Sequence, residues 1–357
     1  MAVKREKKVV EKTEGQELQK LADDLCKKFG KNAVQLGCPD TDGRVVKYLP
    51  TGSFSLDLSL GGGIPLGRFI EICGDFSASK STQAIHMVRE AQRLGINCAY
   101  LDVEGTTDDE YLRSLGVDTS CLLYSNPDGT EEATQMILDM QKSGIVKLAV
   151  FDSLASSAPT KELERDMDES NQLGRQASLL GSFFKRWQAG NNRLFREGKE
   201  PFTVIGLNQV RDKIGAYVPT LYSPGGRAKS HFATVELWLR RGDWITEGTG
   251  VNKEIVGNVV KYKVEKNKTF KRMQTGEFEF YFAENNAGVP VGYNDNLKEV
   301  IECGVEWGVI NKGGAWFSYE DIKVQGLEAL VTALRESPEK VEEIKRKVLD
   351  LAVRVRE

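Results

Sequence analysis

Short apolar runs alternate with amphipathic stretches through the middle of the chain. The apolar runs have the length of buried strands and lie at residues 68–73, 97–103, 147–151 and 202–207. The amphipathic stretches repeat apolar side chains at helical spacing and lie at residues 81–94, 131–143 and 173–192. Repeated strand–helix–strand units predict an α/β fold with a mainly parallel central sheet and helices on both faces.

The N-terminal end of the chain follows a different pattern. Leu18, Leu21, Leu25 and Phe29 have helical spacing and are followed by Gly30. This predicts a helix, and we expect the charged stretch before it, residues 1–14, to be frayed. A polar stretch then separates the helix from the centre of the chain, so that we interpret it as an independent arm.

The C-terminal third changes pattern again. After residue 233, the strand signals at residues 234–239, 255–266 and 277–282 follow one another without helices, which predicts an antiparallel extension of the sheet. From about residue 293, helices alternate with short strand-like pieces. We therefore divide the chain into a helical arm at residues 1–45, an α/β core at residues 46–284 and a small α/β domain at residues 285–357.

Composition narrows the classes of protein that fit this fold. The 357 residues contain 49 Lys and Arg against 52 Asp and Glu, so any site for a polyanion must be a local patch. The six cysteines form no CxxC pair, and only two histidines occur, so we expect neither a disulfide scaffold nor a His-rich metal site. No apolar run is long enough for a membrane span, and we expect a cytoplasmic protein without a membrane partner.

A phosphate-binding sequence follows the first strand of the core. Residues 74–81 read GDFSASKS and lie between a predicted strand and a predicted helix. The P-loop pattern GxxxxGK[ST] is matched at Gly74, Lys80 and Ser81, whereas Ser79 stands where the second glycine belongs. The alternative is an ordinary strand–turn–helix connection with a capping serine. The position at the start of a helix favours phosphate binding.

Polar side chains also follow the other central strands. Glu104 comes just after the second strand, Asp152 ends the third, and Asn208 and Gln209 end the fourth. The carboxyl ends of parallel strands share one edge of a sheet, so we expect these groups to meet there. A carboxylate can activate water, an acid can hold Mg²⁺, and an amide can sense a terminal phosphate. Each residue alone fits a solvated loop, but together they predict a nucleoside triphosphatase site.

The segment behind Gln209 is long and irregular. It carries the basic residues Arg211, Lys213 and Arg227 and the glycines Gly225 and Gly226. Basic side chains and exposed backbone N–H groups suit the backbone of a nucleic acid. The alternative is a lid over the nucleotide.

These motifs resemble those of the RecA family of bacterial and phage recombinases. The resemblance covers about residues 21–348 and is carried by residues 51–57, 61–68, 208–215, 225–226, 266–268 and 313–319. It implies a RecA-type P-loop ATPase core, an N-terminal helix that packs on the neighbouring subunit, and a small C-terminal domain. Such proteins form helical filaments on single-stranded DNA, pair it with homologous duplex DNA and exchange strands in recombination and repair. The resemblance also implies stimulated self-cleavage of a repressor in the DNA-damage response.

The resemblance assigns a role to each candidate position. ATP would be held by Gly74, Asp75, Phe76, Ser77, Ala78, Ser79, Lys80, Ser81 and Thr82, with Asp108 and Tyr111 at the adenine. Ser81 and Asp152 would hold Mg²⁺, Glu104 would be the catalytic base, and Gln209 would report ATP to the DNA loop. Lys266 and Lys268 would reach the γ-phosphate from the adjacent subunit, although as a sequence signal they fit a solvated strand end. The DNA loops would be residues 164–174 and 210–227.

The chain departs from the family pattern at several positions. Ser79 replaces the glycine before the P-loop lysine, Gly105 and Thr106 follow Glu104, and His231 stands where the family has an aromatic interface residue. A side chain at position 79 crowds the phosphates or strains the backbone. One alternative is therefore a filament protein that binds ATP and DNA with weak or lost hydrolysis. Another is a RecA-fold ATPase, such as a regulatory hexamer, that acts on different cargo.

Overall fold

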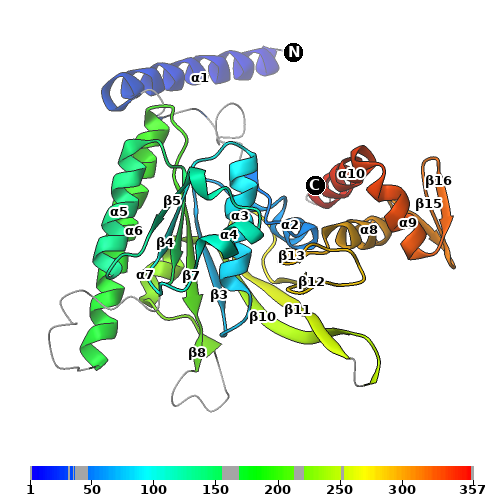
Figure 1. Ribbon diagram of the computed structural model, residues 1–357. Helices are drawn as coiled ribbons and strands as arrows, with labels where there is room; N and C mark the ends of the chain where they lie inside the picture. The colour runs from blue at the N-terminus through cyan, green and yellow to red at the C-terminus, as the bar shows by residue number, and fades with distance from the viewer. Residues whose placement is uncertain are drawn as a thin grey trace.

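The computed structural model describes residues 2–30, 33–34, 36, 47–154, 169–212, 221–250 and 253–354. Figure 1 shows three parts: a long N-terminal helix, a central sheet covered by helices, and a smaller group of helices and strands at the C-terminal end. Among the described residues, no helix is long and apolar enough to cross a membrane. The described cysteines, which are Cys26, Cys73, Cys98, Cys121 and Cys303, are all free thiols.

The core of the described residues is a sheet of nine strands, in the order β13-β12-β11-β10-β3-β7-β6-β4-β5. The strands from β10 to β5 in this order are parallel, and β10 to β13 are antiparallel. This confirms the predicted parallel sheet with an antiparallel extension. Their bounds are β3 Phe69–Gly74, β4 Cys98–Asp102, β5 Leu122–Ser125, β6 Leu148–Asp152, β7 Thr203–Gln209, β10 Ala233–Glu247, β11 Glu254–Asn267, β12 Gln274–Tyr281 and β13 Tyr293–Asn294.

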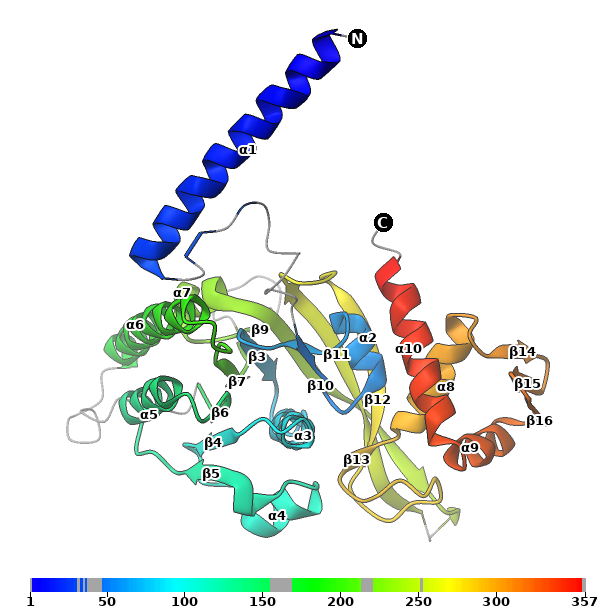
Figure 2. The ribbon, with the colours of Figure 1, turned by 90° about the horizontal axis from the view of Figure 1, so that it is seen from above.

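Helices cover the two faces of the parallel strands. Helix α3 (Lys80–Arg93) packs on one face, where Ile70 and Ile72 of β3 are fully buried, and helix α2 (Phe54–Leu60) packs on the antiparallel strands β11 and β12. Helices α5 (Thr130–Ser143) and α6 (Glu169–Arg196) pack on the other face, against Phe69 and its neighbours. Helix α7 (Gly226–Phe232) lies beside α6, as Figure 2 shows. A short helix, α4 (Asp109–Ser114), follows β4, and a 3-10 turn (Thr119–Cys121) precedes β5.

The antiparallel part extends further than the sequence predicts. Strands β10 and β11 pair from Val235 with Asn267 to Glu247 with Glu254, so that they form a long hairpin between β3 and β12. The pairing of β13 with β12 carries the core sheet to Asn294. The predicted domain division at residue 285 stays a proposal, and this pairing favours a boundary about ten residues further along the chain. The remaining short strands are β1 (Tyr48–Leu49) with β2 (Ile64–Pro65) and β8 (Arg211–Asp212) with β9 (Leu221–Tyr222).

The C-terminal part has its own apolar core, which also includes Phe54 of α2. It consists of α8 (Asn296–Glu306), the antiparallel strands β14 (Asn311–Gly313), β15 (Trp316–Tyr319) and β16 (Ile322–Gln325), α9 (Leu327–Arg335) and α10 (Pro338–Arg354). Polar contacts attach it to the first turn of α2. Ser53 Oγ donates a hydrogen bond of 2.7 Å to Glu299 Oε2, and Phe54 N donates one of 3.0 Å to Asn296 Oδ1.

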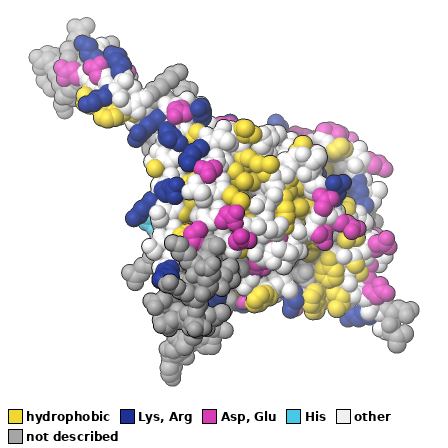
Figure 3. All heavy atoms as spheres, turned by 60° about the vertical axis from the view of Figure 1, so that its left-hand side comes forward, with side chains coloured by type: hydrophobic (Ala, Val, Ile, Leu, Met, Phe, Trp, Pro, Cys, Tyr) yellow, Lys and Arg dark blue, Asp and Glu magenta, His cyan; other side chains and the backbone are white. Residues whose placement is uncertain are grey.

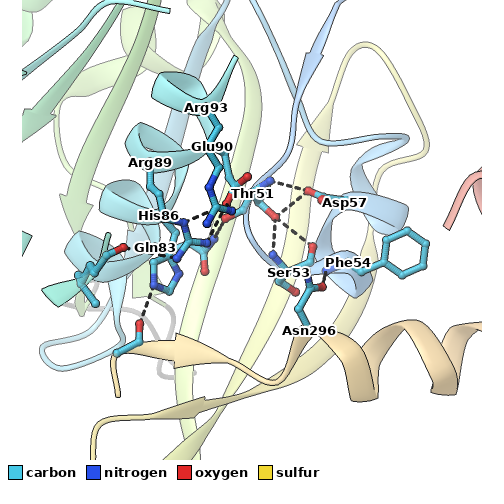
Figure 4. A network of polar contacts seen from close by, with 12 residues as sticks. Thr51, Ser53, Phe54, Asp57, Gln83, His86, Arg89, Glu90, Arg93 and Asn296 are labelled. Atoms are coloured by element: carbon cyan, nitrogen blue, oxygen red, sulfur yellow. Dashed lines mark hydrogen bonds and ion pairs between the residues drawn. The ribbon is translucent and has the colours of Figure 1, made fainter. Parts of the chain in front are cut away.

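The same network reaches the helix that follows the P-loop sequence (Figure 4). Gln83 of α3 donates from Nε2 to Thr51 O at 2.6 Å. Thr51 donates in turn, from both its backbone N and its Oγ1, to Asp57 Oδ1 at 2.7 Å. The segment 51–57 is therefore fixed on one side by α3 and on the other side by the C-terminal domain.

The N-terminal helix α1 (Ala2–Phe29) projects from the body of the molecule, as Figures 2 and 3 show. It begins at Ala2, so the helix includes the stretch that we expected to be frayed. Among residues 15–29 only Ala22 is buried, whereas Leu18, Leu21 and Phe29 are more than half exposed. Figure 3 shows basic side chains gathered along the edge of the body beside this arm.

Candidate active site

The loop after β3 adopts a left-handed backbone at two serines. Ser77 has φ 57° and Ser79 has φ 59°, a region that costs a residue with a side chain about 1–2 kcal/mol. Ser79 makes no side-chain hydrogen bond to the first turn of α3. N–H groups in the first turn of a helix have no partner within the helix, so this turn suits an anion. At Gly74, a Cβ would lie 2.4 Å from Leu239 O, which explains the glycine.

Lys80 lies across this loop. Its Nζ donates to Gly74 O at 3.0 Å and to Asp75 O at 2.7 Å. Burial lowers the pKa of Lys80, and the charges of Asp152 and Glu104 oppose that change. The ammonium group is therefore held at the loop with two carboxylates nearby.

Ser81 and Asp152 meet beside the same turn. Ser81 Oγ donates to Asp152 Oδ2 at 2.8 Å, and Tyr100 OH donates to the same oxygen at 2.7 Å. Burial raises the pKa of Asp152, although these hydrogen bonds oppose the change. A hydroxyl and a carboxylate are oxygen ligands of the kind that Mg²⁺ prefers, so the pair fits that ion. Sequence reasoning missed Tyr100, because every residue of β4 is buried and the pattern does not distinguish its two faces.

Glu104 and Gln209 come together from different strands. Glu104 Oε1 accepts a hydrogen bond of 2.7 Å from Ser153 Oγ and one of 3.2 Å from Gln209 Nε2. The sheet order β3-β7-β6-β4 makes this possible, because the strands that end near these residues are neighbours. The structure thus brings Glu104, Gln209 and the Ser81–Asp152 pair to one edge, as expected. The expectation was wrong for Asn208, which is fully buried and donates to Glu71, Ser223 and Pro224 instead.

Asp102 holds the turn that carries Glu104. Its Oδ1 accepts from Gly105 N at 2.8 Å, and its Oδ2 accepts from Thr107 N at 2.8 Å and from Tyr124 OH at 3.0 Å. No role is predicted for Asp102 from the sequence. The sequence pattern that indicates this turn is an aspartate at the end of a buried strand with a glycine three residues later. Asp side chains often accept hydrogen bonds from the backbone of such turns.

Tyr111 lies against the P-loop helix. Its OH is 2.7 Å from Thr82 Oγ1, and burial raises its pKa. Asp108 begins α4 and accepts a hydrogen bond of 2.6 Å from Tyr111 N. The two residues expected at the adenine are therefore adjacent, and Tyr111 reaches the first turns of α3.

Lys266 and Lys268 contact helix α7. Lys266 Nζ donates to Ser230 O, and Lys268 Nζ donates to His231 O at 2.8 Å. In the sheet register, Lys266 pairs with Glu236, and Glu236 pairs with Glu71 of β3. Glu71 is three residues before Gly74, where the loop begins, which corresponds to about 10 Å along the strand. A single chain thus does not place these lysines at the P-loop.

The expected DNA-binding residues are described in part. Arg211 is exposed at the start of β8, and Gly225 and Gly226 have φ 107° and 79° at the beginning of α7. Lys213 and the side chain of Arg227 lie outside the described residues. Of the other expected loop, residues 164–168 also lie outside them, and residues 169–174 belong to α6.

Comparison with known proteins identifies the family of this chain. The sequence model of the RecA N-terminal domain matches residues 16–287, and that of the RecA C-terminal domain matches residues 298–352. Protein RecA of Thermus thermophilus is 38% identical over 330 residues, which are 91% of each chain. Protein RecA of Chloroherpeton thalassium is 39% identical over 317 residues, which are 87% of this chain and 82% of that protein. The chain therefore belongs to the RecA family of recombinases.

Proposed function

We propose that this chain is a DNA-dependent ATPase that uses ATP and Mg²⁺ to form filaments on single-stranded DNA and to pair it with homologous duplex DNA. The observation that carries the proposal is the contact between Gln209 and Glu104 beside the Ser81–Asp152 pair. It joins the beginning of the expected DNA loop to the carboxylate that would act on water. Family membership supports the same function.

Each residue at this edge has a distinct task in the proposal. Lys80 and the first turn of α3 bind and neutralise phosphate oxygens. Ser81 and Asp152 hold Mg²⁺, which supplies further neutralisation of the phosphates when it is bound. Ser153 and Gln209 hold the Glu104 carboxylate, so that it can orient a water molecule and accept its proton.

The proposal also needs a second subunit. Within one chain, Lys266 and Lys268 contact carbonyls of α7 and lie away from the P-loop. We propose that they complete the site of the adjacent subunit, where they supply positive charge to the phosphates. Hydrolysis then depends on assembly, because the cations reach the developing charge only in the filament.

Steady-state ATP hydrolysis with and without single-stranded DNA tests the proposal. We expect hydrolysis to increase strongly with DNA and to fall at moderate salt, because phosphate contacts release counterions. Glu104→Gln should lower turnover by at least about 100-fold, as loss of a general base does, while ATP still binds. The proposal is wrong if DNA leaves the wild-type rate unchanged.

The left-handed backbone at Ser79 supports a second candidate function, a filament protein that binds ATP and DNA with weak or lost hydrolysis. This candidate predicts ATP-dependent binding of single-stranded DNA together with a turnover rate that DNA does not change. Measuring DNA binding and hydrolysis on the same protein separates the two functions.

A further inference from the structure

A buried ion pair joins helix α7 to the strand that leads to the P-loop, three residues before Gly74. Lys229 of α7 donates from Nζ to Glu71 Oε1 of β3, and their side chains are 0% and 1% exposed. The same oxygen accepts a hydrogen bond of 2.9 Å from Asn208 Nδ2 and one of 2.5 Å from Ser223 Oγ. Three donors thus converge on a single carboxylate oxygen.

These residues come from four segments that all lead to the candidate active site. Glu71 is three residues before Gly74, and Asn208 directly precedes Gln209. Ser223 lies at the returning end of the expected DNA loop, and Lys229 is on the helix that follows that loop. The network therefore connects both ends of the loop to the strand that enters the P-loop.

Asn208 can hold this network in more than one way. Its Nδ2 lies 2.9 Å from Glu71 Oε1, 2.7 Å from Ser223 Oγ and 2.8 Å from Pro224 O. An amide nitrogen carries two hydrogens, so it satisfies two of these three acceptors at a time. Movement of residues 223–224 changes which acceptors remain and so alters the position of the residue before Gln209.

Helix α7 extends the connection to the lysine pair. The carbonyls of Ser230 and His231, which directly follow Lys229, accept the hydrogen bonds from Lys266 and Lys268. A displacement of α7 therefore moves Lys229 of the ion pair together with the two carbonyls that bind Lys266 and Lys268.

The energetics of a buried ion pair favour such a role. Desolvation offsets most of the attraction, so apolar residues of similar volume often give equal stability, whereas removal of one partner leaves an uncompensated buried charge. The pair is thus better explained by the arrangement that it fixes than by the stability that it adds.

We propose that Lys229 and Glu71 are positioning residues that couple DNA binding at the 210–227 segment to Gln209 and to the Lys266–Lys268 pair. This inference rests on the proposed function. The coupling is reciprocal, so ATP binding must strengthen DNA binding through the same pair.

The double variant Glu71→Gln/Lys229→Met tests the inference, because it removes both charges and keeps similar volumes. The measurements are thermal unfolding, the Kd of a non-hydrolysable ATP analogue, and the Kd of single-stranded DNA with and without that analogue. We expect unchanged folding and an analogue Kd within about twofold of wild type. The analogue-dependent gain in DNA affinity should fall about tenfold, within the usual range of allosteric coupling. DNA stimulation of hydrolysis should fall in parallel.

A matched control removes a different ion pair. Lys298 and Glu279 are 2.7 Å apart at the contact between the core and the C-terminal domain. The variant Glu279→Gln/Lys298→Met should keep the wild-type coupling. If the Glu71/Lys229 variant also keeps it, the inference is wrong. If wild type itself shows no gain in DNA affinity with the analogue, the proposed function fails and the inference fails with it.

Discussion

Gln209 Nε2 lies 3.2 Å from Glu104 Oε1, so a residue at the end of β7 directly contacts a carboxylate that follows β4. The contact spans the width of β6, which separates these two strands in the sheet. The segment 210–227 begins at the next residue, so Gln209 is attached directly to one end of the expected DNA loop. This hydrogen bond therefore joins the residue before the expected DNA loop directly to the candidate base.

Replacement of Ser79 by glycine should remove backbone strain. At φ 59°, glycine avoids the cost of a side chain but loses more entropy on folding, so we expect a gain of about 0.5–1 kcal/mol in the free energy of unfolding. Urea denaturation measures this gain. We also expect faster ATP turnover, because the loop loses a side chain beside the phosphate site.

Glu320→Gly is the control for this prediction. Glu320 has φ 50° in the turn between β15 and β16, far along the chain from the P-loop. It should give a similar gain in stability and no change in turnover. Equal effects of both variants on turnover would contradict a specific role of Ser79.

The shared site can be tested by mixing two inactive proteins. Glu104→Gln lacks the base, and Lys266→Ala/Lys268→Ala lacks the two lysines. In a randomly mixed filament, about one interface in four joins an intact base to intact lysines, because each interface uses different surfaces of two subunits. Mixed proteins should therefore recover about a quarter of the wild-type ATPase rate. If both proteins are inactive alone and the mixture shows no recovery, the lysines act within their own chain.

The attachment of the C-terminal domain should weaken as the pH rises. Burial raises the pKa of Glu299 from 4.5 to about 7 and that of Asp57 from 3.8 to about 7. A raised pKa means that the folded protein binds the proton more tightly, so this stabilisation is complete below pH 4.5 and is lost as the pH approaches 7. For Glu299 the loss is about 3 kcal/mol.

Glu299→Gln should flatten this pH dependence. The glutamine oxygen can still accept the hydrogen bonds from Ser53 and Ser55, but the side chain no longer ionises. Denaturation curves between pH 5 and pH 8 measure the effect, and Glu336→Gln is the control because its side chain is exposed. The same slope in Glu299→Gln as in wild type would assign the pH dependence to other groups.

Arg211 should contribute one phosphate contact to DNA binding. Its side chain is exposed at the start of the expected DNA loop. Arg211→Ala should weaken binding of single-stranded DNA and reduce the slope of log K against log salt by about 0.7, the value for one counterion on a single strand. Fluorescence titrations over a range of salt concentrations measure the slope. Arg193→Ala, at the far end of α6, should leave it unchanged.

The elements of the core could be predicted because their signals are local. Buried parallel strands are continuous apolar runs, and helices repeat with their own period. The helix predicted at residues 81–94 is found at Lys80–Arg93. Strand β5 was missed because its four residues are half-exposed or exposed, without alternation.

The environment of Lys229 could not be predicted from the sequence. A lysine within GRAKSHF looks like any solvated basic residue. Its burial depends on Glu71, which is 158 residues earlier in the chain, and on the order of strands that places β10 beside β3. Long-range pairing of this kind leaves no local pattern. The positions of Glu104, Asp152 and Gln209 were predictable because one rule, the shared edge of parallel strands, applies to all three. The rule does not tell which way a side chain points, so it gave the wrong position for Asn208.

The projecting helix α1 affects whether the proposed assembly of these chains is closed or open-ended. Leu18, Leu21 and Phe29 of this helix are more than half exposed, and in the filament that we propose they pack on the next subunit. The two surfaces of this contact, helix α1 and its binding site on the next subunit, are then different parts of the chain. Such a heterologous contact gives an open helical filament when the rotation between subunits does not close a ring. Each subunit added to the proposed filament leaves one helix α1 exposed at the same end. In the proposed filament, the fold therefore sets the geometry of each step but no final number of subunits.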